Sequence, residues 1–248
     1  MSAVALIVVV GIFAAGLLRG FTGFGLAMAA APVLSLAMPP QQFVPVIVTL
    51  QLLTGAVDLP LLWRQADWRP ILWLVVAMVV CTPLGLLALA YMSADAARLA
   101  IGLLIFAAIA LLGRGLVLPE HPARWITLLV GAISGVMNGV AAMAGPPAVV
   151  YFLALRCPTE VMRASTISYF FLTAAAAMVP MAWRGLASWE TTLWALIALP
   201  ALLLGQWLGT LGFRRTNPDT HRRVALVTLT VLASLLTGQA LLALANGP

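Results

Sequence analysis

The sequence has little charge and no lysine. Of its 248 residues, 8% are charged and 63% are hydrophobic, and all 13 basic residues are arginine. The mean hydropathy is +1.10. A soluble domain of this size cannot bury so much apolar surface, and the apolar runs reach the roughly 20 residues that a membrane-crossing helix needs. The composition therefore predicts an all-α integral membrane protein, a polytopic helical bundle whose partner is the lipid bilayer.

Several functional classes lack their sequence patterns. The net charge of +6 does not indicate nucleic acid, because the arginines stand singly or in pairs between apolar runs, where membrane topology explains them. Cys81 and Cys157 fit neither a disulfide framework nor a metal site, and both histidines, His121 and His221, fall at polar breaks. No P-loop or nucleophile-elbow pattern occurs. We therefore expect neither an enzyme nor an ATP-driven pump, and no metal or other cofactor.

Polar breaks divide the apolar sequence into helices of about membrane length. They lie near residues 39–42, 64–69, 93–98, 114–124, 156–163, 184–190 and 214–223. Two intervals, Ala3–Met38 and Trp125–Leu155, are too long for one comfortable crossing and are interrupted by Gly and Pro. We expect each to be a broken segment, either a re-entrant hairpin or two short crossings. Such backbone survives at membrane depth only where protein buries it or water lines it.

The second half of the chain repeats the first. GLLRGFTGFGLAMAAAP, residues 16–32, aligns without a gap with GAISGVMNGVAAMAGPP, residues 131–147. The coinciding positions include Gly16 with Gly131, Gly20 with Gly135, and Pro32 with Pro147. LPLLWR before the 64–69 break likewise matches VPMAWR before the 184–190 break. We therefore predict two transmembrane repeats, residues 1–118 and 119–248, within one integral membrane domain.

The arginines indicate the orientation of these repeats. If each broken segment makes a single crossing, five arginines lie on one side of the membrane and seven on the other. If each broken segment returns to its starting side, only Arg98 and Arg184 lie outside, and ten lie inside: Arg64, Arg69, Arg114, Arg124, Arg156, Arg163, Arg214, Arg215, Arg222 and Arg223. The positive-inside rule favours the second arrangement. It predicts two inverted repeats, each a broken segment followed by three transmembrane helices, with both termini outside.

The broken segments supply the candidate binding residues. In inverted-repeat transporters, half-helix N-termini face anionic substrate near the midplane, and glycine lets backbone approach a ligand. Arg19 is the only arginine well inside an apolar interval and could hold an oxyanion by two hydrogen bonds. Thr22, Ser134 and Asn138 offer neutral hydrogen bonds to the same anion. Alternatively, the GxxxG-spaced glycines serve close helix packing, and Arg19 extends from a helix end to the interface.

Asp58 is the only carboxylate within an apolar run. Two interpretations are open. Asp58 forms an interfacial pair with a nearby arginine, or it couples transport to protons.

The two glycine-rich stretches, the length and the duplication are similar to those of the TauE/SafE sulfite exporter family, also called the toluene sulfonate uptake permease family. The resemblance covers essentially the whole chain. It implies a transporter, commonly an exporter, of small sulfur-containing anions such as sulfite, sulfoacetate or other organosulfonates, in a bacterial inner (plasma) membrane. Carried over residue by residue, the family's motif positions are Gly20, Gly23, Gly25, Pro32, Gly135, Gly139, Gly145, Pro146 and Pro147.

We expect the substrate to bind near the midplane between the two broken segments. A cell interior negative by about 100 mV favours export of one negative charge by roughly 2.3 kcal/mol, so the membrane potential or an ion gradient would drive transport. The alternative is a membrane scaffold or assembly factor without a substrate, whose broken segments would pack dry. The exact substrate, the direction, the coupling ion and any homo-oligomer are left open by the sequence.

Overall fold

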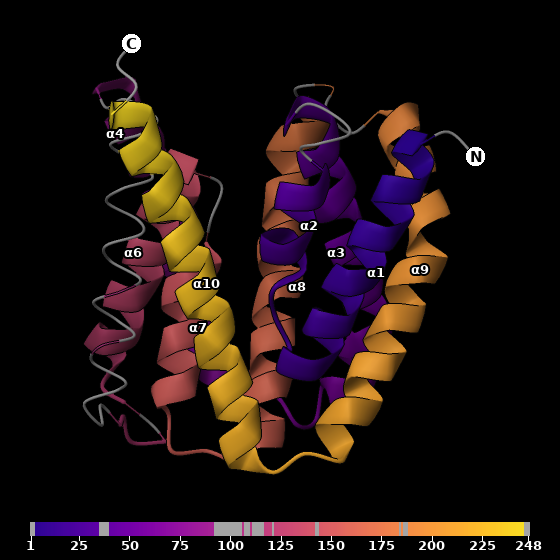
Figure 1. Cartoon of the computed structure of the whole chain (residues 1–248). Helices are drawn as coiled ribbons and strands as arrows, with labels where there is room; N and C mark the ends of the chain where they lie inside the picture. Colours follow the sequence, from indigo (N-terminus) through magenta and orange to yellow (C-terminus); the bar gives the residue numbers. More distant parts are fainter. Residues whose placement is uncertain are drawn as a thin grey trace. The chain divides into compact units, whose positions relative to one another are not determined.

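The computed structural model describes residues 3–34, 40–91, 106, 110, 117–120, 122–141, 144–183, 185 and 188–245. Every element named in these ranges is an α-helix (Figure 1). Their only recorded β pairing is an isolated bridge between Leu118 and Leu155. The prediction of an all-α protein is therefore confirmed.

In each half of the chain a long helix is followed by a short helix and then by further long helices. The first half has α1 (Ala3–Thr22), the short α2 (Leu26–Leu34), α3 (Pro40–Leu62) and α4 (Trp68–Tyr91). The last crossing predicted for this half lies almost wholly outside the described residues. The second half has α6 (Arg124–Ala141), the short α7 (Gly145–Ala154), α8 (Thr159–Trp183), α9 (Trp189–Arg214) and α10 (Pro218–Ala245).

Three polar breaks are shorter than the sequence suggests. The helices after them begin at Pro40, Thr159 and Pro218, inside the stretches expected to be loops. Proline suits the first turn of a helix because its missing N–H would have no intrahelical partner there. Polar residues next to a proline are therefore part of the following helix.

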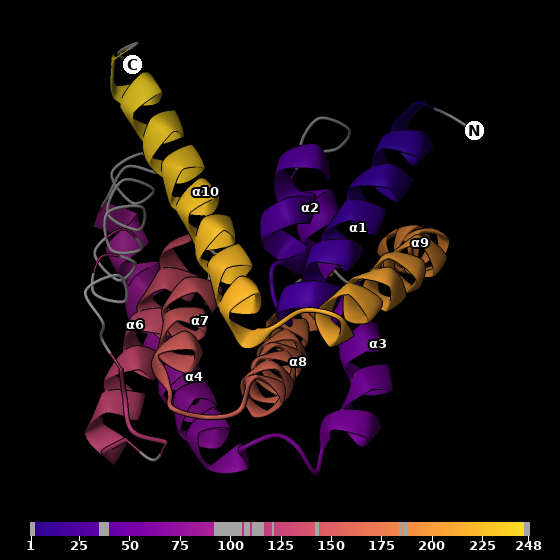
Figure 2. The same ribbon diagram turned by 60° about the horizontal axis from the view of Figure 1, so that its bottom comes forward.

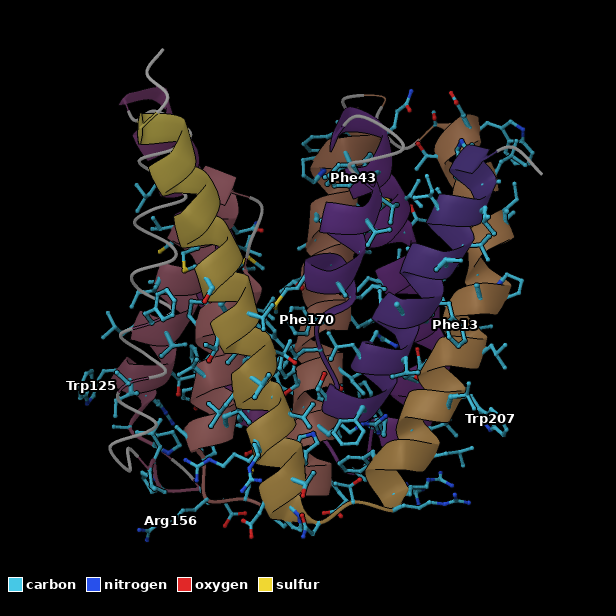
Figure 3. The ribbon with its side chains drawn as sticks, viewed as in Figure 1. Phe13, Phe43, Trp125, Arg156, Phe170 and Trp207 are labelled. Carbon is cyan, nitrogen blue, oxygen red and sulfur yellow. The ribbon has the colours of Figure 1, made fainter. Side chains whose placement is uncertain are left out.

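Five of the described helical segments are long and apolar enough to cross a membrane: Ala5–Thr22, Gln42–Leu62, Trp68–Gly85, Thr159–Trp183 and Trp189–Arg214. Large apolar side chains are exposed on these segments and on α6. Trp125 on α6 and Trp207 on α9 extend away from the ribbon (Figure 3) and are 66% and 58% exposed. Lipid is a suitable environment for such a surface, whereas water is not.

The chain gathers into two compact units, each described here by itself. Unit 1 comprises residues Met1–Ala66 and Phe170–His221, and unit 2 comprises Asp67–Tyr169 and Arg222–Pro248. Each unit combines segments from both halves of the sequence. The repeat boundary between residues 118 and 119 concerns similarity along the sequence, and it stays a prediction.

In unit 1, α1 lies along α9 and the two helices approach closely at glycines (Figure 1, Figure 2). A Cβ atom at Gly16 would lie 2.5 Å from the carbonyl oxygen of Leu202, and one at Gly20 would clash with the backbone of Gln206. Gly205 and Gly209 of α9 face the backbone of α1 in the same way. The GxxxG spacing in these helices therefore serves close packing.

Unit 2 contains a similar pair, in which α6 packs on α4. A Cβ atom at Gly131 would lie 2.7 Å from the carbonyl oxygen of Leu74, and one at Gly135 would clash with the carbonyl oxygen of Met78. The packing interpretation thus accounts for the glycine pairs in the first helix of each predicted broken segment. Their part in substrate binding stays a prediction.

Candidate functional site

The turn between α1 and α2 depends on two glycines. Gly23 and Gly25 have φ angles of 86° and 94°, a region that residues with a Cβ atom rarely adopt. The Thr22 hydroxyl lies 2.8 Å from the Leu18 carbonyl oxygen and 2.9 Å from that of Phe24, within donating distance of both. It also accepts a hydrogen bond from the Phe24 N–H. Three predicted binding residues therefore build this turn.

Arg19, one turn before this break, joins a buried polar cluster in unit 1. Its Nη1 donates to Oδ2 of Asp58 on α3 at 2.9 Å and to Oε1 of Gln206 on α9. The Gln206 Nε2 donates to both Asp58 oxygens, at 2.7 Å and 2.9 Å. We call these three residues the Arg19 cluster. It connects three helices by a closed ring of hydrogen bonds.

The Arg19 cluster is withdrawn from solvent. The side chains of Arg19 and Asp58 are 3% and 13% exposed. An isolated buried charge costs several kcal/mol, and an ion pair with further hydrogen bonds offsets much of that cost. The second guanidinium nitrogen, Nη2, is buried and has no hydrogen-bond partner among the described residues. The cluster thus holds one strong donor that another acceptor could use.

The Arg19 cluster bears on the alternatives left open for its two charged members, and proton coupling by Asp58 stays a prediction. Arg19 does not extend to the interface, because it is buried against α3 and α9. Asp58 does pair with an arginine, but the partner is this buried one. The sequence held a signal for the pairing, since Arg19 and Asp58 are the only basic and the only acidic residue inside apolar intervals, and buried charges pair. Gln206, the third member, was not a predicted site residue.

The second broken segment, in unit 2, has a different polar environment. Ser134 on α6 is fully buried beside the Tyr169 hydroxyl, which donates to the carbonyl oxygen of Ala144 at 3.2 Å, directly before α7. Asn138 donates to the Thr82 hydroxyl on α4 at 3.4 Å. The buried polar residues described in unit 2 are Ser and Thr, and none of them is charged.

The remaining predicted positions lie in or beside the short helices. Gly145 begins α7, and Pro146 and Pro147 occupy its first turn, where proline costs no intrahelical hydrogen bond. Every residue of α7 is buried. Pro32 lies in α2 and Gly139 in α6. Thus Arg19, Gly20, Thr22, Gly23, Gly25, Pro32 and Asp58 belong to unit 1, and Ser134, Gly135, Asn138, Gly139, Gly145, Pro146 and Pro147 to unit 2.

A cavity of about 250 Å³ lies in unit 2 beside the polar breaks that precede α4 and α6. Arg69, Arg124 and Glu120 contribute charges of both signs to its wall, and the Arg124 guanidinium carbon lies 5.9 Å from the centroid of the Trp73 ring. The sequence did not single out this cavity, because its residues come from separate breaks. Its mixed charge gives it no clear preference for an anion.

Among the described residues, no group of three or more His, Cys, Asp or Glu side chains could hold a metal ion. Cys157 lies half-buried between α7 and α8. Burial, with a smaller contribution from nearby Glu120 and Asp67, raises the pKa of Cys157 to about 11. Its thiol therefore stays protonated, and poorly nucleophilic, at neutral pH.

Comparison with known proteins gives one family and one curated relative. The family model for sulfite exporter TauE/SafE matches residues 7–236. A protein of Cupriavidus necator named "Probable sulfite/organosulfonate exporter TauE" is 29% identical over 223 residues, which cover 87% of each chain. No solved structure matches the chain significantly.

Proposed function

Because the chain belongs to the sulfite exporter TauE/SafE family, we propose that it exports small sulfur-containing anions, such as sulfite, sulfoacetate or other organosulfonates. The name of the C. necator relative supports this class of substrate. The five helices suited to membrane crossing support a multi-pass protein, and we assign it to the inner (plasma) membrane of a bacterium. The membrane potential or an ion gradient supplies the driving force.

The observation that carries the assignment of the site is the buried guanidinium of Arg19. Its Nη1 is held by Asp58 and Gln206, while its Nη2 is buried without a partner among the described residues. Sulfite and sulfonates carry oxygens that accept such hydrogen bonds, and a charge-assisted bond is strongest away from water. We therefore assign the anion to the face of Arg19 that presents Nη2.

We further propose that the halves are inverted repeats with both termini outside, and that both broken segments contribute to the transport path. Each supplies a short helix, α2 or α7. The first N–H groups of α2 have no intrahelical partner, whereas α7 offers fewer because Pro146 and Pro147 have no N–H. Thr22, Gly23 and Gly25 shape the first break, and Ser134, Asn138 and Gly145 the second. Gly20 and Gly135 contribute by holding α1 and α6 tightly against their neighbouring helices.

The test is flux of sulfite, sulfoacetate and sulfate in proteoliposomes under an imposed membrane potential. We expect the wild type to transport sulfite or sulfoacetate, and Arg19→Gln to lose the flux because it lacks the guanidinium. Arg64→Gln is the matched control, since Arg64 is an exposed arginine beside the end of α3 in the same unit. It should keep the wild-type rate.

A second variant separates lost binding from lost folding. Arg19→Gln alone leaves Asp58 buried without its cation, whereas Arg19→Gln with Asp58→Asn is neutral and retains hydrogen-bonding groups at both positions. We expect the double variant to fold and still not transport. Flux in the folded double variant would remove Arg19 from the site. A wild type that moves none of these anions would favour a membrane scaffold or assembly factor instead.

A further inference from the structure

The carboxylate of Asp58 and the proposed anion contact the same guanidinium, because Asp58 binds Nη1 of Arg19 and the anion is assigned to Nη2. The carboxylate receives one hydrogen bond from Arg19 and two from Gln206, so both oxygens are engaged. A sulfonate that approaches Arg19 presents the same kind of acceptor, negatively charged oxygen, to the same guanidinium. Asp58 and the substrate therefore share the single positive charge of Arg19.

The charge balance of the Arg19 cluster changes when an anion arrives. Arg19 and Asp58 together are neutral, and one bound monovalent anion makes the cluster −1 in a buried site. Such a net charge is costly away from water unless a cation or a proton compensates it. The question is which group in unit 1 can supply the compensation.

The helices packed around Asp58 offer no second cation beside it. Asp58 is the only titratable residue of α3, and Arg19 the only one of α1. Neither α2 nor the part of α8 in unit 1 has any, and those of α9, Glu190 and Arg214, lie at its two ends. His221 of unit 1 packs between the rings of Phe21 and Phe213. Protonation of Asp58 itself is the most direct way to restore neutrality.

Building on the proposed function, we propose that Asp58 takes up one proton when a sulfonate binds Nη2 of Arg19, so that one proton travels with each anion. When the anion leaves on the far side, Asp58 gives up its proton there and pairs with Arg19 again. Gln206 is a positioning residue in this cycle. Its amide both donates and accepts, so it can bind the carboxylate and the carboxylic acid alike.

This inference predicts which gradient drives transport. One proton moving with one monovalent anion carries no net charge, so the accumulation of the anion follows the pH difference and does not respond to the voltage. Export by this cycle would then run down the anion's own concentration gradient, because an alkaline cell interior favours inward movement of the pair. An anion that moves without a proton carries one charge, and about 59 mV then shifts its accumulation ratio tenfold. The two cases are separable by experiment.

The experiment uses methanesulfonate in proteoliposomes, because this monovalent sulfonate stays ionised across the working pH range and cannot itself carry the proton. Anion flux is followed with labelled substrate, internal pH with a trapped dye, and the voltage is set with potassium and valinomycin. We expect about one proton per anion, roughly tenfold accumulation for a pH difference of about one unit, and no response to about 59 mV.

The opposite result would overturn the inference. If methanesulfonate moves without protons and accumulates about tenfold for about 59 mV, Asp58 is not coupled to transport, although the proposed function stands. If methanesulfonate does not move while sulfite does, the inference fails for sulfonates. If no sulfur anion moves, the proposed function fails with it.

Variants of two acidic residues of unit 1 sharpen the test. Asp58→Asn keeps the shape and hydrogen-bonding groups of the side chain but cannot exchange a proton, so flux should become voltage-driven, with about a tenfold change per 59 mV. Glu190→Gln removes an exposed carboxylate from the first turn of α9 and should keep the wild-type proton ratio. If Asp58→Asn does not fold, the proton ratio of the wild type still decides the matter.

Discussion

The two units have the same kind of helix packing but different buried polar groups. In unit 1, α1 packs on α9 through glycines, and in unit 2, α6 packs on α4 in the same way. A short helix follows α1 and α6 alike. Unit 1 then buries an arginine, which binds the partly buried Asp58 and Gln206, whereas the fully buried polar residues described in unit 2 are hydroxyl-bearing and uncharged. The glycine-mediated helix packing therefore does not require a buried charge.

The difference shows where electrostatics matters in the protein. Hydroxyl groups can hydrogen-bond to backbone carbonyls within their own helix, as Thr166 does with Met162 at 2.8 Å. Their burial costs little once that bond is made. A buried arginine needs a partner of opposite charge, and Arg19 finds it on another helix. Unit 1 thus carries an energetic cost that packing alone does not require, as is common for functional sites within membranes.

The largest expected effect comes from breaking the Arg19 cluster. Arg19→Leu should destabilise the protein by about 3–5 kcal/mol, because it leaves the Asp58 carboxylate buried without its cation. Adding Asp58→Leu should recover most of the loss. Thermal unfolding in detergent measures both changes. If Arg19→Leu alone is as stable as the wild type, the ion pair of the Arg19 cluster does not stabilise the protein.

A smaller effect should follow from filling the glycine contacts, and it should be similar in the two units. Gly20→Ala and Gly135→Ala each place a Cβ against backbone of the neighbouring helix, and overpacking of this kind costs about 1–3 kcal/mol. Gly238→Ala in α10 is the control, since a Cβ there meets nothing within 4 Å. If only one of these two variants lowers the unfolding midpoint, the two units do not share this packing.

The break in unit 1 should be sensitive to strain as well as to crowding. Gly25→Ala combines a φ of 94° with a Cβ 2.9 Å from Cδ2 of Leu18, and we expect a loss of about 1–3 kcal/mol. Gly185→Ala separates the two causes, because its φ is 69° but nothing lies within 4 Å. The difference between their unfolding free energies measures the crowding at Leu18. Equal losses would assign the whole effect to strain.

The smallest effect is expected for a neutral contact of unit 2. Thr127 and Tyr151 share a buried hydrogen bond of 2.9 Å, and Tyr151→Phe should cost about 1 kcal/mol. A double-mutant cycle with Thr127→Val gives the coupling energy of this pair. It should be well below the value for Arg19 and Asp58. A coupling of similar size would mean that charge is not what distinguishes the units.

The sequence predicted the all-α class of the fold. The apolar composition, the duplicated glycine-rich stretches and the prolines at helix starts are local signals, and they are visible without a structure. The helix starts at Pro40 and Pro218 were misjudged, because polar residues beside a proline look like a loop although they form the first turn of a helix. The glycine spacing left packing and binding as alternatives, and only the neighbouring helices showed the packing.

By itself, the sequence determined that this chain is an all-α membrane protein of the TauE/SafE type. Its apolar composition and its motifs lie within short stretches of chain, so they can be recognised without knowing which helices pack together. Only the tertiary structure decided that Arg19 pairs with Asp58 and Gln206, because these residues are separated by 39 and 187 positions along the chain. Contacts at such separations depend on which helices pack together. The physical reason is that a buried charge must find a partner, while the packing of the helices chooses which residue that partner is.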